Sequence, residues 1–284
     1  MHIMSSHGLV SVIVPTKNSE KHLDRCLRSI REQTVADIEL IVVDNFSIDR
    51  TEQIARQYGA VFVQYGPERS AQVNYGVRIS SGSYVFKVDS DFVLQPSVVE
   101  ACIAKAEEGF GAVVVHNTPD SSISLLAKIR KFEVDMYKYR LEHSSARFLR
   151  KETFVSIGGF SETITAGEDY DFQNRLNKRG VHTGFVDPEA LHLGEPTILW
   201  PLLVKYFDYG MDFSNFLSTN PDSGKHQIGP WRREYLENWK MIVTHPAMST
   251  LLGGYLILKY SAGISGFLYG KFYRKWSILK APNA

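Results

Sequence analysis

Residues 84–91 read YVFKVDSD, a short apolar strand that ends in two carboxylates separated by one residue. In an extended or just-turning backbone, side chains at positions i and i+2 point to the same side, so Asp89 and Asp91 are expected to converge beyond the strand. Two carboxylates at this spacing repel each other unless a cation or a hydrogen-bonding ligand lies between them. A hard divalent ion that carries a diphosphate would meet this need. Two solvated aspartates in a loop are the alternative, and the rest of the sequence separates the two readings.

The composition is that of an ordinary globular protein. The chain has 284 residues, 44% hydrophobic and 22% charged, enough for one large core or a core plus an appendage. The formal net charge of +1 gives no bulk field that would favour nucleic acid as a partner. Cys26 and Cys102 have no metal-ligand spacing and make no disulfide framework, which fits a reducing cytosol. Residues 1–8 lack the basic and apolar regions of a secretory signal.

Strands and helices alternate through the first ninety residues. The predicted strands are 10–14, 39–43, 60–64 and 83–88, and the predicted helices are 20–33, 49–58 and 69–79. These strands are apolar throughout, which predicts a parallel sheet covered on both faces. Ligands of such sheets bind beyond the carboxyl ends of the strands. Since Pro15, Asp44 and Asp89 all lie at such ends, we expect them to face one crevice.

The second half of the chain is more mixed. Its predicted helices are 96–107, 124–139 and about 168–179, and its predicted strands are 112–116, 146–150 and 181–186. A glycine-rich turn stands at 158–160, and the chain from residue 196 onward looks helical.

Other polar residues are candidates for chemistry. Glu168 and Asp169 open a predicted helix, where acids usually complement the helix dipole but where one could act as general base toward an acceptor hydroxyl. A lone histidine such as His192 is more often a structural hydrogen bonder, and it becomes a metal-ligand candidate if the fold brings it to Asp91. Arg69 is either solvated or placed to meet phosphate, because it begins a predicted helix. Nothing in the chain matches a Walker loop or a dinucleotide fingerprint.

Five short segments in order carry a resemblance to a known family. They are VSVIVPTKN (10–18), VVDNFSIDRT (42–51), DSD (89–91), GGF (158–160) and EDYD (168–171). Together they resemble the family 2 glycosyltransferases with the GT-A fold, over roughly residues 8–195. The chain departs from the family pattern at Lys17, where tyrosine is common, and at Asn45, where a second aspartate is usual. The Q-x-x-R-W motif of processive polymer synthases is absent, which favours transfer of a single sugar.

The resemblance implies an α/β GT-A domain, with a Rossmann-like, mostly parallel sheet flanked by helices, and metal-dependent inverting transfer from a nucleoside-diphosphate sugar. Asp169 or Glu168 would be the catalytic base, and Mn²⁺ or Mg²⁺ would be the metal. The metal candidates are Asp91, Asp89 and His192. The candidates for binding the nucleotide are Pro15, Thr16, Asn18, Glu20, Asp44, Arg69 and Asp89.

Residues 196–284 are predicted to form a helical appendage that associates with a membrane. The segment 246–270 is apolar except for Lys259, and a central lysine in a spanning helix costs roughly 2.5–3.5 kcal/mol. The basic tail that follows would violate the positive-inside rule if the segment spanned once from a cytosolic domain. We therefore expect helices lying on the cytoplasmic face, with spanning and ordinary packing or oligomer contact as alternatives. A polyprenyl-linked or other membrane-proximal glycan acceptor would suit such a placement.

Two further functions compete with sugar transfer. A sugar-phosphate nucleotidyltransferase would need a glycine-rich basic loop for triphosphate, which residues 15–18 do not supply. A non-catalytic, membrane-associated binding protein with the same fold is the other alternative.

Overall fold

The computed structural model of the chain describes residues 8–35, 37–164, 166–220 and 232–280. The first seven residues and Trp231, which entered the predictions about a signal and about the aromatic C-terminal region, lie outside these ranges. The chain divides into two compact units. The first is Met1–Thr118, Tyr139–Glu162 and Phe172–Gly194; the second is Pro119–Lys138, Thr163–Asp171 and Glu195–Ala284. The predicted division into 8–195 and 196–284 stays a prediction.

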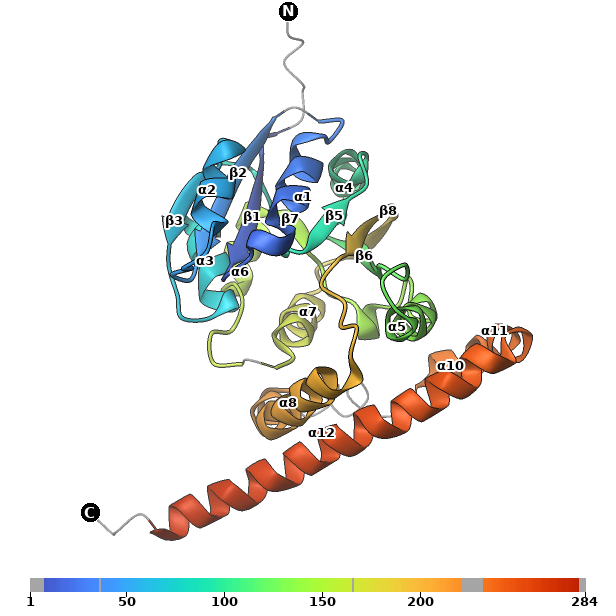
Figure 1. Cartoon of the computed structure of the whole chain (residues 1–284). Coiled ribbons are helices and arrows are strands. Elements are labelled where there is room, and N and C mark those ends of the chain that lie inside the picture. The colour runs from blue at the N-terminus through green and yellow to red at the C-terminus, as the bar shows by residue number, and fades with distance from the viewer. Residues whose placement is uncertain (1–7, 36, 165, 221–231, 281–284) are drawn as a thin grey trace, which may run out of the picture. The chain divides into compact units, whose positions relative to one another are not determined.

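The first unit is built on one eight-stranded sheet with the order β3-β2-β1-β4-β7-β6-β8-β5 (Figure 1). Its strands are β1 (Val10–Thr16), β2 (Ile38–Asp44), β3 (Val61–Gln64), β4 (Tyr84–Lys87), β5 (Phe92–Leu94), β6 (Ala112–Pro119), β7 (Phe148–Arg150) and β8 (Thr183–His192). The four strands β3, β2, β1 and β4 are parallel, as predicted.

Beyond β4 the sheet contains antiparallel pairs, so the sheet as a whole is mixed. Strand β7 pairs antiparallel with β4 and with β6, and β5 pairs antiparallel with β8. Strand β5, which the sequence analysis missed, begins only five residues after Lys87. A parallel neighbour needs a crossover of a dozen or more residues, so β5 joins the far edge of the sheet instead.

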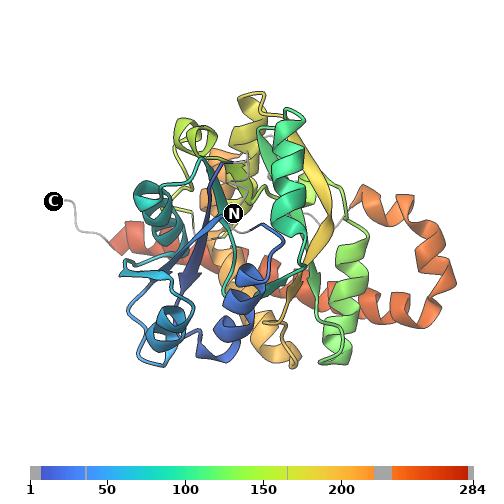
Figure 2. The same cartoon turned by 90° about the horizontal axis from the view of Figure 1, so that it is seen from above.

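Helices cover both faces of this sheet, each over its own apolar core (Figure 2). The helices of the unit are α1 (Glu20–Arg31), α2 (Thr51–Gln57), α3 (Arg69–Ile79), α4 (Val98–Glu107), α6 (Lys151–Ile157) and most of α7 (Glu168–Lys178). One face buries Leu23, Leu27 and Ile30 of α1, the residues whose helical spacing predicted that helix. Cys26 and Cys102 are free thiols buried in the same core.

Local differences from the predictions have local causes. Helix α6 was missed; it ends at Gly158, which adopts the left-handed region with φ of 87° and so stops the helix. The predicted helix at 124–139 ends at Asp135, and Tyr139 has a φ of 65°. Ser124 caps its start, accepting from Ala127 N over 3.0 Å.

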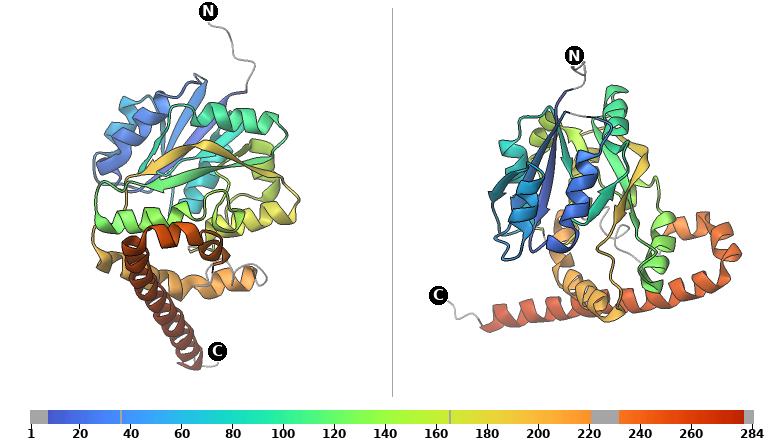
Figure 3. Two further views of the ribbon diagram at one scale, coloured as in Figure 1. Left: turned by 90° about the vertical axis from the view of Figure 1, so that its right-hand side faces the viewer. Right: turned by 45° about the horizontal axis from the view of Figure 1, so that its top comes forward.

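The second unit is helical. It contains α5 (Leu125–Asp135), the first turn of α7, α8 (Leu199–Thr219), α10 (Arg233–Glu237), α11 (Trp239–Thr244) and the long α12 (Pro246–Lys280), which packs along α8 (Figure 3). The two helices approach closely through glycine: a Cβ on Gly266 would lie 1.9 Å from Phe207 O. Within the described residues, one helix, Pro246–Phe272, is long and apolar enough to cross a membrane; its mean hydropathy is 1.3 and 17% of it is buried.

Candidate active site at the carboxyl ends of the parallel strands

The loops after β1 and β2 are tied to each other by side-chain hydrogen bonds. Thr16 Oγ1 donates to Asp44 Oδ1 over 2.8 Å, and Ser47 N donates to Asp44 Oδ2 over 2.7 Å. Asp44 is fully buried, so both carboxylate oxygens serve the loops themselves. Asp44 therefore holds the shape of this corner, where the nucleotide base is predicted to bind.

Asn18 and Glu20 complete the same corner. Asn18 has a φ of 47°; its N–H donates to Ser47 Oγ over 2.7 Å, and its Oδ1 accepts from Ile48 N over 3.0 Å. Glu20 Oε2 accepts from Arg50 N over 3.2 Å. Pro15 is buried at the end of β1. The predicted nucleoside-binding residues therefore form one preorganised loop pair before any ligand is present.

Asp89 lies among basic side chains. Its Oδ2 accepts from Arg147 Nη1 over 2.7 Å, and its Oδ1 lies 3.7 Å from Arg69 Nη1. Burial alone would raise the pKa of Asp89, but Arg147, Lys87 and Arg69 outweigh it and hold the pKa well below its ordinary value. Oδ1 is buried, and no hydrogen bond reaches it from any residue that the structure describes. The site thus contains a charged carboxylate surrounded by basic side chains.

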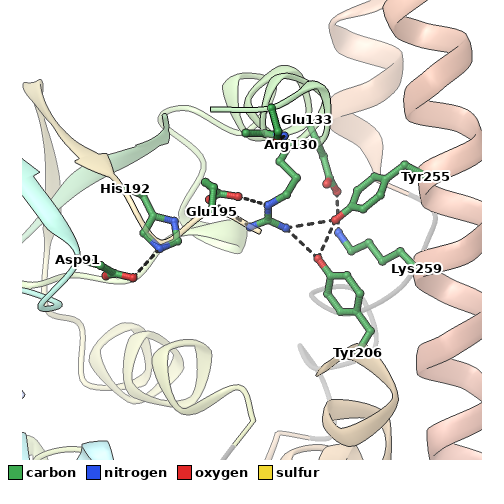
Figure 4. A network of polar contacts seen from close by, with 10 residues as sticks. Asp91, Arg130, Glu133, His192, Glu195, Tyr206, Tyr255 and Lys259 are labelled. Carbon is green, nitrogen blue, oxygen red and sulfur yellow. Dashed lines mark hydrogen bonds and ion pairs between the residues drawn. The ribbon is translucent and has the colours of Figure 1, made fainter. Parts of the chain in front are cut away.

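Asp91 and His192 meet, although 101 residues separate them. His192 Nε2 lies 3.1 Å from Asp91 Oδ2, because β5 and β8 pair with Phe92 opposite His192 (Figure 4). The Phe92 ring contacts the imidazole edge to face at 5.1 Å. A Cβ on Gly194 would lie 2.0 Å from Asp91 Oδ2 and 3.1 Å from His192 Nε2. Glycine at position 194 therefore allows the Asp91 carboxylate and the His192 imidazole to pack this closely against the backbone.

The Asp91–His192 pair fits a divalent metal. One carboxylate oxygen and one imidazole nitrogen are a donor set that Mn²⁺ accepts. Among the described residues there is no group of three or more His, Cys, Asp or Glu that could hold a metal. A metal held here would take its remaining ligands from diphosphate oxygens and water, as is usual for ions that work with phosphate substrates.

Glu168 and Asp169 belong to the second unit, where they open α7. Gly167 precedes them with a φ of 90°. A Cβ added at this position would lie 2.9 Å from the Phe216 ring. Asp171 Oδ1 accepts from Asn220 Nδ2 over 3.2 Å. Residues of α8 and its C-terminal end therefore hold the start of α7 from within this unit.

Arg147 is the site residue that the sequence analysis missed. It was part of a predicted strand, 146–150, and carried no local signal. In the structure its guanidinium also lies over the Phe92 ring, 4.8 Å from the centroid. Only the pairing of β7 with β4 brings it to Asp89.

Comparison with known proteins gives a consistent result. Escherichia coli chondroitin synthase is 27% identical over 187 residues, covering 61% of this chain but only 27% of that protein, so this chain spans little more than a quarter of that relative. The succinoglycan biosynthesis protein ExoA of Rhizobium meliloti (strain 1021) is 27% identical over 254 residues, 80% of this chain and 77% of that protein.

A solved structure shares the fold. The mannosyltransferase PcManGT from Pyrobaculum calidifontis, in complex with GDP-Man and Mn²⁺, matches with a TM-score of 0.65 at 16% identity, over 94% of this chain and 88% of that one. The prediction of the GT-A fold is confirmed. The family description "Glycosyl transferase family 2" matches residues 11–162, more than half of the chain. The chain therefore belongs to glycosyl transferase family 2.

Proposed function

We propose that this protein is a metal-dependent, inverting glycosyltransferase that moves one sugar from a nucleoside-diphosphate sugar to an acceptor hydroxyl. The observation that carries the proposal is the Asp91–His192 pair, two positions along the chain from Asp89, which basic side chains surround. Such an arrangement suits a diphosphate that arrives with its metal.

The donor is held by groups of the first unit. The loop pair around Asn18 and Asp44 receives the nucleoside, and Arg69 and Arg147 supply the positive field for the diphosphate. Asp91 and His192 would hold Mn²⁺ or Mg²⁺, which would supply Lewis-acid stabilisation of the negative charge on the nucleoside diphosphate.

The acceptor is activated by a carboxylate. Asp169, with Glu168 as the alternative, accepts the proton of the incoming hydroxyl and makes it a better nucleophile. Attack from the face opposite the leaving group inverts the anomeric centre, through a transition state with oxocarbenium character. An acceptor that is already a phosphate would need the base less.

Relatives support the choice of substrates to test. The neighbour's complex contains GDP-Man and Mn²⁺, and the relatives are named for chondroitin and succinoglycan synthesis. We place the acceptor among glycans or polyprenyl-linked sugars at the cytoplasmic face of a membrane, where the apolar α12 would hold the protein.

Release of nucleoside diphosphate from a panel of UDP- and GDP-sugars, measured with Mn²⁺, with Mg²⁺ and with a chelator, tests this function. Asp91→Ala should abolish turnover and Asp169→Asn should reduce it severely, with both proteins folded by circular dichroism. Wild-type rates in both variants would refute the site assignment. Pyrophosphate release from a nucleoside triphosphate and a sugar phosphate would instead indicate a nucleotidyltransferase, and donor binding without any release would indicate a binding protein.

A further inference from the structure

Helix α12 carries a single charge along its apolar part, and that charge points into the protein. Between residues 246 and 270, Lys259 is the only charged residue. Its Nζ lies 2.8 Å from Glu133 Oε1 on α5, with side-chain exposures of 15% for Lys259 and 3% for Glu133. Burial alone would raise the pKa of Glu133, but Lys259 and Arg232 lower it to about 2. The pair is therefore ionised at neutral pH.

Further polar contacts lie on the same side of α12. Tyr255 OH accepts from Arg130 Nη1 over 3.2 Å and lies 2.8 Å from Tyr206 OH (Figure 4). Arg130 itself pairs with Glu195. Leu252 and Tyr255 are buried beside Lys259, at the spacing of one helix face. The inward face thus holds both the buried apolar residues and the buried ion pair.

The outward face of α12 is exposed and carries no charged residue between residues 246 and 270; the exposed Lys271 follows this stretch. Its large apolar residues are between 41% and 70% exposed; they are Leu251, Ile257, Leu258, Ile264, Leu268, Tyr269 and Phe272. The smaller exposed residues among them are glycine and serine, namely Gly253, Gly254, Ser261 and Ser265. A helix face that meets water normally carries charged side chains. The composition of this face suits an apolar environment.

A spanning orientation does not fit the neighbours of α12. Lys259 stands near the middle of the apolar stretch, and there it is bonded to α5. Helix α5 carries Lys128, which is exposed, and the half-exposed pair of Lys131 and Asp135, 2.7 Å apart. At the midplane of a bilayer these charges would face hydrocarbon, which is strongly unfavourable. Helix α12 is consistent with lying along the membrane surface rather than crossing it.

The charge of the region favours anionic lipid. From residue 238 to residue 284 the sequence contains no Asp or Glu, and besides Lys259, which pairs with Glu133, it has five Lys or Arg. Exposed Trp239 and Val243 on α11 extend the apolar surface, with the exposed Lys240 between them. Aromatic and basic residues beside an apolar helix face are typical of interfacial helices.

We infer that the outward face of α12 lies in the interfacial layer of an anionic bilayer, while the Lys259–Glu133 pair keeps the helix bound to the protein. The inference rests on the proposed function for the expectation that α12 holds the protein at a membrane, and it goes further by assigning the helix face and the lipid charge. Its test measures vesicle binding rather than turnover, so the two can fail separately.

The experiment is flotation of the full chain with vesicles of phosphatidylcholine alone and with vesicles that also contain the anionic lipid phosphatidylglycerol. The wild type should float with the anionic vesicles. Ile257→Gln/Leu268→Gln should lower the partition coefficient about tenfold or more, because two exposed apolar side chains no longer enter the interface. The matched control, Val61→Gln/Val155→Gln, changes two exposed valines of the first unit and should bind as the wild type does.

Three outcomes would overturn the inference. One is undiminished binding of the Ile257→Gln/Leu268→Gln protein whose circular dichroism is unchanged. A second is a wild type that ignores vesicles but forms a dimer that this variant dissociates, which would assign the face to a second copy. A third is a vesicle-bound wild type that resists alkaline carbonate extraction, since a surface-bound helix is released and a spanning one is not.

Discussion

Arg147 Nη1 donates to Asp89 Oδ2 over 2.7 Å, although 58 residues lie between them. The guanidinium lies over one side of the site's Phe92 ring, and the same ring meets His192. Asp89 and Asp91 therefore have different partners, an arginine for the first and a histidine for the second. This difference lowers the electrostatic cost of having two carboxylates at positions i and i+2, because basic side chains of the protein neutralise Asp89.

Replacing Arg147 tests its contribution to donor binding. Arg147→Met should lower kcat/KM for the donor about 100-fold, because the buried Asp89 loses its closest countercharge and the diphosphate loses a cation. Arg147→Lys should recover part of this loss, since it keeps the charge but not the planar group over Phe92. Steady-state kinetics with varied donor measures both, and equal kcat/KM for Arg147→Met and wild type would contradict this role.

Removing the imidazole of His192 should weaken metal binding and leave the fold intact. For His192→Ala we expect the Mn²⁺ concentration for half-maximal activity to rise about 10- to 100-fold. The exposed His182 provides the control: His182→Ala should leave the Mn²⁺ curve unchanged. Coinciding curves for His192→Ala and wild type would show that His192 is only a structural hydrogen bonder.

Gly194 offers a test in which a single methyl group is added. In Gly194→Ala the new Cβ would lie 2.0 Å from Asp91 Oδ2, so the carboxylate must move away from His192. Activity should fall about 100-fold, as expected when site geometry shifts by about 1 Å. Gly254→Ala, where a Cβ meets nothing within 4 Å, should stay active. Full activity in Gly194→Ala would mean that the Asp91–His192 contact is dispensable.

The Glu133–Lys259 pair predicts a non-additive mutant cycle. Glu133→Gln should lower the free energy of unfolding by about 3–5 kcal/mol, because it leaves the buried Lys259 without its counterion. Adding Lys259→Met should restore much of this loss, since both charges are then gone. Urea denaturation of the wild type, both single variants and the double variant measures the coupling; additive effects would argue against a buried ion pair.

The same pair predicts a pH dependence. The folded-state pKa of Glu133, about 2, lies below the ordinary 4.5, so its stabilising effect is full above pH 4.5 and is lost as the pH falls toward 2. The wild type should lose on the order of 3 kcal/mol from this source, the product of the shift and 2.303RT. The double variant Glu133→Gln/Lys259→Met should lack this component when unfolding free energies are compared at pH 5 and pH 2.5. An equal loss of unfolding free energy in the wild type and the double variant would show that a group other than Glu133 causes the pH dependence.

Much of the first unit could be predicted because its signals are local. The apolar runs that became β1, β2, β3 and β4, and the helical spacing of α1, need only neighbouring residues to be recognised. Strand β5 has three residues and helix α6 has seven, too few for a period to stand out, and both were missed. The antiparallel half of the sheet depends on the lengths of the connections and on which edge of the sheet is free. A short segment of sequence contains neither kind of information.

The sequence by itself determined the acidic tips of the parallel strands, the apolar C-terminal helix and the membership of the family, because residue type and period are local properties. Only the tertiary structure decided that Arg147 reaches Asp89 and that His192 reaches Asp91, since strand pairing brings together residues 58 and 101 positions apart. It also decided that Lys259 turns inward to Glu133, 126 positions away. For Arg147–Asp89 and Lys259–Glu133 the physical reason is the cost of burying a charge, because packing that removes a charged group from water has to supply its partner. For His192–Asp91 the reason is the pairing of β5 with β8.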